Sequence, residues 1–82
     1  DITEQVYSVM KKYSNEIKID NFRLIENGSF INVIFDMVYP AKLQKREEEI
    51  RKDVSDRLMS ENPRYHIIIK GIIRRERFSL HR

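Results

Sequence analysis

The sequence has no cysteine and no tryptophan, and its 82 residues include only two glycines and two prolines. Without cysteine, the chain can form neither disulfides nor thiolate metal sites, which is compatible with a reducing compartment. Gly28 and Gly71 are too far apart to build a phosphate-binding glycine loop, and no HExxH or paired-cysteine spacing occurs. We therefore expect that the chain is not an enzyme.

Long apolar runs and a large excess of one charge are also missing. No segment approaches the roughly 20 apolar residues that cross a bilayer, and no signal peptide is visible. Sixteen Lys and Arg are interleaved with thirteen Asp and Glu, which leaves a net charge of +3. This mildly basic balance, with a pI near 9.3, is only weak support for a nucleic-acid partner.

The length of the chain is that of one domain, which we assign to residues 1–82. A chain this short buries only about 60–65% of the surface that its unfolded form exposes, so association with a partner would add to its stability. The sequence begins at Asp1, directly in a helical pattern. We interpret it as a fragment of a longer protein.

Two apolar runs joined by Asn27-Gly28 dominate the first half of the sequence. Asn-Gly is the preferred centre of a type I′ turn because both residues tolerate positive φ. The segment Ile17 to Pro40 is therefore predicted as a β-hairpin in which Leu24 faces Ile31. Its apolar face carries Phe22, Leu24, Ile31, Val33, Phe35 and Met37. Its other face mixes apolar and polar residues: Ile17, Ile19, Asn21, Arg23, Ile25, Phe30, Asn32, Ile34, Asp36 and Val38.

Helical patterns lie on both sides of this hairpin. Residues 1–13 place apolar side chains on one stripe of a helix, and Leu43 to Asn62 form a second, charge-rich helix with one narrow apolar stripe. The dense charges of residues 45–49 are interpreted as a solvated helix surface. Asn62-Pro63 ends that helix, and the isoleucine-rich segment Arg64 to Arg74 is predicted as a third strand. Residues 75–82 are a basic tail.

The predicted order is therefore helix, strand, strand, helix, strand. A strand-helix-strand unit crosses over right-handed, so the third strand runs parallel to the second. The fold class is α+β, an open-faced two-layer α/β sandwich in which a mixed three-stranded sheet carries both helices on its apolar face. The other face of the sheet stays open, and an exposed apolar patch of that kind usually marks a protein interface. We predict a dimer interface made of Arg23, Ile25, Phe30, Asn32, Ile34 and Val38.

Three sequence blocks resemble a known family. The block IDNFRLIENGSFINVIFDMVYP, followed by REEEIRKDV and NPRYHIIIKG, looks like the C-terminal cytosolic domain of the cation diffusion facilitator (cation efflux) transporters. Asp20 to Arg23 occupy the family's first strand motif, and Asn32 to Pro40 match its second. The resemblance covers most of the chain, from about Glu16 to Gly71.

The resemblance implies a metallochaperone-like domain that hangs below a transmembrane antiporter, on the cytoplasmic side of the cell membrane, and that dimerises there. Its partners would be a second copy and the transmembrane domain of the same chain, and no nucleic acid is expected. The family exports zinc and other divalent cations in exchange for protons through the membrane part. No cofactor is expected in this fragment itself.

The metal ligands of the family are where this sequence departs from the pattern. Positions that often carry His and Asp in the family correspond here to Asp20 or Asn21, Lys70 and Ile72, and lysine and isoleucine are poor zinc ligands. Only Asp20, Asp36 and His66 remain as candidate ligands, with a structural role favoured for His66. We therefore predict no tight zinc site.

A second function class stays open at this point, namely a small RNA-binding or ribosome-associated α/β module. The basic tail and the high pI favour it. A binder of single-stranded nucleic acid would expose aromatic side chains on its sheet for stacking. The predicted open face is aliphatic apart from Phe30, so the transporter domain is the favoured interpretation.

Overall fold

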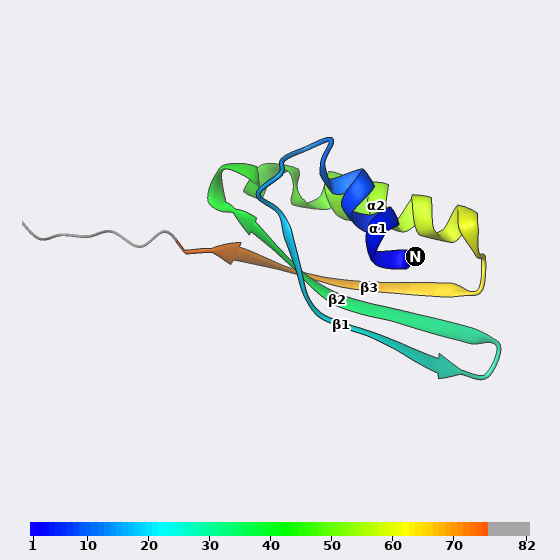
Figure 1. Ribbon diagram of the computed structural model, residues 1–82. Coiled ribbons are helices and arrows are strands. Elements are labelled where there is room, and N and C mark those ends of the chain that lie inside the picture. The colour runs from blue at the N-terminus through cyan, green and yellow to red at the C-terminus, as the bar shows by residue number, and fades with distance from the viewer. Residues whose placement is uncertain (76–82) are drawn as a thin grey trace, which may run out of the picture.

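The computed structural model describes residues 1–75, which fold as the sequence predicts into a three-stranded sheet with both helices on one face (Figure 1). The helices are α1 (Ile2–Met10) and α2 (Glu47–Glu61), with a 3-10 turn η1 (Ala41–Arg46) leading into α2. The strands are β1 (Lys18–Asn27), β2 (Phe30–Pro40) and β3 (Tyr65–Arg74). The middle strand β2 pairs antiparallel with β1 and parallel with β3, which confirms the mixed sheet and the α-β-β-α-β order. The predicted basic tail, beyond Arg75, lies outside the described residues.

Each helix buries the row of apolar side chains from whose spacing it was predicted. The Asp1 carboxylate accepts a hydrogen bond from the Thr3 backbone N–H at 2.9 Å and caps the start of α1. Both helices are shorter than predicted, because residues 11–13 turn away after Met10 and residues 41–46 form η1. The core consists of Val6, Val9, Met10, Ile17, Val33, Phe35, Met37, Tyr39, Leu43, Ile50, Val54, Leu58 and Ile69.

The turn of the hairpin differs from the prediction. Asn27 pairs with Phe30, so the central residues are Gly28 and Ser29 and not Asn27 and Gly28. Gly28 has a φ of +64° and Ser29 has no positive φ, the pattern of a type II′ turn and not of type I′. The predicted register is therefore wrong by two residues, and Leu24 faces Val33. A shift of two leaves every side chain of β2 on its predicted face, because side chains alternate with a period of two.

A β-bulge in β1 changes the face of two residues that were predicted to point away from the core. The register shifts between Asp20 and Arg23, and Asn21 adopts a φ of 53°. The extra residue inverts the alternation along β1, so Ile19 faces Met37 and Ile17 is only 1% exposed. The prediction that Ile17 and Ile19 share the open face is therefore wrong.

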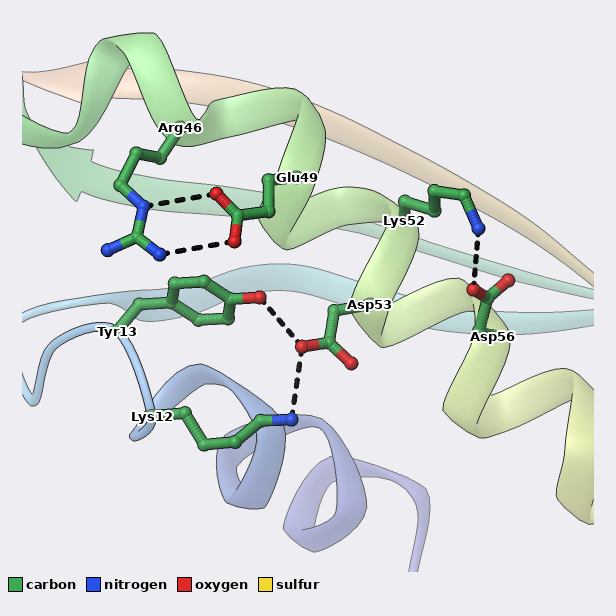
Figure 2. Close-up of polar contacts among 7 residues, drawn as sticks. All are labelled: Lys12, Tyr13, Arg46, Glu49, Lys52, Asp53 and Asp56. Carbon is green, nitrogen blue, oxygen red and sulfur yellow. Dashed lines mark hydrogen bonds and ion pairs between the residues drawn. The ribbon is translucent and has the colours of Figure 1, made fainter.

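The two helices are joined by a polar cluster at the end of α1 (Figure 2). The Tyr13 hydroxyl donates to Asp53 at 2.7 Å, and the Lys12 ammonium lies 3.0 Å from the same carboxylate. The Arg46 guanidinium stacks 4.8 Å above the Tyr13 ring and pairs with Glu49. The hydrogen bond to Asp53, together with desolvation, raises the pKa of Tyr13 to about 12, and the bonds from Tyr13 and Lys12 lower the pKa of Asp53. This cluster fixes α1 against α2.

Candidate functional site

The sheet face without helices, here called the open face, is continuous across all three strands (Figure 1). Its large apolar side chains are substantially exposed: Phe30 is 56% exposed, Ile25 46% and Ile68 42%. In the middle of this face, Ile34 of β2 lies between Arg23 of β1 and Ile68 of β3. The open face therefore has the apolar centre that the sequence predicts.

The six predicted interface residues come together on this face. Arg23 pairs with Ile34 and Ile25 with Asn32, so the neighbours differ by two residues from those predicted but lie on the same side. Phe30 and Val38 continue the surface along β2. The structure supplies the surface, and its role as a dimer interface remains a prediction.

The sequence prediction omitted the contribution of β3 to this surface. His66, Ile68 and Ile72 pair with Asn32, Ile34 and Val38, which extends the open face by one strand. A groove of about 540 Å³ lies at the hairpin end, and its lining residues are Asn27, Phe30, Asn32, Met59, Pro63, Tyr65, His66 and Ile68. The alternation of the isoleucine run could have identified Ile68 and Ile72, whereas the groove depends on the position of α2.

Two of the three candidate metal ligands are neighbours in the sheet. Asp20 pairs directly with Asp36 across β1 and β2, and the Asn21 amide donates to the Asp36 carboxylate at 2.7 Å. Like charges directly opposite one another destabilise a sheet. The next residue in the same row, on β3, is Lys70, whose ammonium is a cation and not a zinc ligand.

The third candidate, His66, lies elsewhere on the open face. Its Nδ1 is 3.0 Å from the Asn32 side-chain oxygen. Asn32 and Asp36 are four residues apart on β2, a separation of about 13 Å along a strand. In residues 1–75 no three His, Cys, Asp or Glu side chains gather as a metal site would require. The side chains on this face therefore do not fit a zinc ion.

A second polar cluster, which the sequence prediction missed, links α2 to the sheet. The buried Tyr39 hydroxyl donates to Glu47, and Arg51 lies 3.6 Å from the same carboxylate. Burial, reinforced by the Glu47 hydrogen bond, raises the pKa of Tyr39 to about 12. A Cβ at Gly71 would overlap the Glu47 carboxylate. Glu47 is therefore not the solvated helix residue that was predicted, because it fills the space above Gly71.

Comparison with known proteins is informative at the level of structure. No family model matches the sequence, and no curated protein matches it either. Within residues 1–75, no helix is long and apolar enough to cross a membrane. Among solved structures, the chain is similar to the metal-bound C-terminal domain of the CzcD transporter from Thermotoga maritima. The TM-score is 0.65 at 12% sequence identity, and the match covers 90% of this chain and 86% of that one. The chain therefore has the fold of the CzcD transporter's C-terminal domain, the fold that its resemblance to the cation diffusion facilitator family implied.

Proposed function

We propose that the chain is the cytosolic dimerisation and regulatory domain of a divalent-cation efflux transporter of the cation diffusion facilitator family. The observation that carries the proposal is the likeness to the CzcD C-terminal domain over 90% of the chain, together with the family's strand motifs in β1 and β2. In this proposal, an attached transmembrane part exchanges zinc or a similar cation for protons. The domain lies on the cytoplasmic side of the cell membrane.

Dimerisation through the open face is supported by its exposed apolar centre. At about 25 cal/mol per Å², burying several hundred Å² of this surface contributes several kcal/mol before the association entropy is subtracted. Much of that gain is offset, so the isolated domain is expected to associate weakly. Attachment to a dimeric membrane part would raise the effective concentration and hold the two copies together.

The row of Asp20, Asp36 and Lys70 bears on the regulatory role. Because the basic residue Lys70 is the β3 partner of Asp36, which is itself the partner of Asp20, the carboxylate row has a cationic side chain at its end without any metal ion. We propose that contact between two open faces does not depend on zinc binding by this domain. The divalent cation belongs to the membrane part, as the substrate of transport.

The RNA-binding alternative finds less support. Phe30 is the sole aromatic side chain that residues 1–75 place on the open face, and a stacking surface for bases uses several such rings. Lys70 and Arg23 share this face with Asp20 and Asp36, so its basic residues do not form a track of one sign. We therefore propose no nucleic-acid partner.

The test uses the full-length protein to which the chain belongs. Expressed in a zinc-sensitive strain without its own exporters, the protein should restore growth in zinc and lower cell-associated zinc. Removing residues 1–82 should weaken this protection, while an epitope inserted after Gly28, at the exposed hairpin turn, should be accessible only from the cytoplasm. A full-length protein without transmembrane spans, or one that leaves zinc tolerance and zinc content unchanged, would contradict the proposal.

A further inference from the structure

Besides the open face, the outer edge of β3 is a surface at which a strand of another molecule could add to the sheet. β3 is the last strand of the sheet, so only one of its sides bonds to β2. The Ile31 N–H donates to the Arg64 carbonyl, and because strand residues alternate, the even-numbered residues from Arg64 onwards bond to β2. The odd-numbered residues direct their backbone groups outwards: Ile67, Ile69, Gly71, Ile73 and also Tyr65, whose N–H already donates to the Asn62 carbonyl.

The composition of this edge makes it a ready template for another strand. β3 is ten residues long and reads YHIIIKGIIR, with one lysine in its interior and no proline. Proteins usually protect such edges with charges, proline, bulges or a covering element, because unpaired backbone groups recruit other strands. β1, at the opposite edge, carries its bulge at Asn21, whereas β3 pairs with β2 in unbroken register.

One side chain covers the middle of the β3 edge. The Arg51 Nη1 donates to the Ile69 carbonyl at 3.2 Å, which is the one outward backbone group of β3 that a side chain bonds within residues 1–75. Arg51 and Ile69 also line a hollow of about 260 Å³ between α2 and the edge, together with Glu48, Lys52, Ser55 and Ile67. The guanidinium thus occupies the position that the N–H of an added strand would take.

The position of Arg51 is fixed by its neighbours on α2. Its guanidinium lies 3.6 Å from Glu47 and 3.3 Å from Glu48, and Glu47 is itself held by the Tyr39 hydroxyl. The Arg51 side chain is only 35% exposed. A chain of contacts therefore runs from the core, through Glu47 and Arg51, to the edge of the sheet.

We propose that Arg51 is a strap that closes the β3 edge against a second copy of this chain, and that releasing it allows two β3 edges to pair antiparallel. A second copy is the occupant because two identical edges meet about a twofold axis, where each backbone donor finds the matching acceptor. The resulting contact joins edges and leaves both open faces free. It is therefore distinct from the proposed open-face dimer.

The experiment is carried out in the Phe30→Asp background, where open-face association is blocked, and uses sedimentation velocity. Arg51→Met keeps the aliphatic stem and removes the donors. It should convert the monomeric Phe30→Asp background into a concentration-dependent dimer, with a dissociation constant about tenfold or more below the highest concentration at which the background stays monomeric. Lys52→Ala removes a neighbouring charge that lines the same hollow but pairs with Asp56 and bonds no backbone group of β3, so this variant should stay monomeric in the same background. Adding Ile73→Pro should abolish the new association. Proline lacks the N–H that residue 73 directs outwards, while every hydrogen bond between β3 and β2 is kept.

Two results would overturn the strap. One is a folded Arg51→Met variant whose association equals that of its background, and the other is new association that survives Ile73→Pro. If Arg51→Met does not fold, Glu47→Gln replaces it, since it weakens the ion pair that positions Arg51 while leaving an acceptor for Tyr39. The same gain of association and the same reversal by Ile73→Pro are then expected, and failure of either rejects the proposal.

Discussion

Gly71→Ala tests whether the space above β3 is reserved for the Glu47 carboxylate. Gly71 has no positive φ, so the backbone accepts alanine and the expected cost is steric. The new methyl group would overlap the Glu47 carboxylate and displace it from Tyr39 and Arg51. Tyr39 is only 1% exposed, so its hydroxyl would lose its partner without gaining access to water.

The size of the effect follows from the bond that is lost. A hydrogen bond to a charged group contributes about 1.5–3 kcal/mol to stability. Replacing glycine with alanine also lowers the entropy of the unfolded chain, which raises the free energy of unfolding by about 0.4–1 kcal/mol. A net loss of about 1–2 kcal/mol is expected, which lowers Tm by about 4–16 °C in a domain of this size.

Urea denaturation of a double-mutant cycle separates this explanation from a general intolerance of alanine. In the Glu47→Ala background no carboxylate remains to be displaced, so Gly71→Ala should be neutral or slightly stabilising. The two substitutions should therefore show a coupling energy of about 1–3 kcal/mol. Equal destabilisation in both backgrounds would refute the assignment of this space to Glu47.

Three further predictions concern metal binding, alkaline pH and the bulge. Calorimetric titration of the domain with zinc should show no tight site, and a submicromolar stoichiometric site lost on replacing His66 or Asp20 would contradict this. Because the pKa values of Tyr13 and Tyr39 are raised from 10.0 to about 12 in the fold, their contribution to stability is complete below pH 10 and is lost as the pH rises towards 12. Urea denaturation between pH 10 and 12 should show the free energy of unfolding falling, and the fall should be smaller in Tyr13→Phe. Asn21→Val should destabilise the domain by about 1–2 kcal/mol more than Asn21→Gly, because a β-branched residue is strained at positive φ. Equal thermal stabilities of the two variants would show that the positive φ of residue 21 does not matter for stability.

The elements and the helix-covered face were predictable because they depend on local spacing. The stripe of Val6, Val9 and Met10 in α1 and the alternation of Val33 and Phe35 in β2 identify the buried side chains directly. The parallel direction of β3 follows from the strand-helix-strand order, because a crossover helix is the usual connection between parallel strands. These features need no knowledge of distant contacts.

The errors arose where distant or conformational choices decide the outcome. The Asn27-Gly28 pair favours a type I′ turn, yet the strands pair in a register that places Gly28 and Ser29 at the centre. The bulge at Asn21 depends on one backbone conformation that no spacing reveals, and it moves Ile17 into the core. Glu47 belongs to a charged run, and its partial burial depends on the Tyr39 hydroxyl and on Gly71, which only the folding of β2 and β3 under α2 brings next to it.

The measurement that tests the central claim most directly is sedimentation equilibrium of Phe30→Asp, with circular dichroism to confirm folding. Leu24→Asp is the matched control, since Leu24 is 50% exposed, close to the 56% of Phe30, but lies on the opposite side of the same hairpin. The account predicts a weak dimer for the unmodified domain and for Leu24→Asp, and a folded monomer for Phe30→Asp. A folded Phe30→Asp variant that remains dimeric would contradict the open face as the interface, and an unfolded one would show that Phe30 belongs to the core.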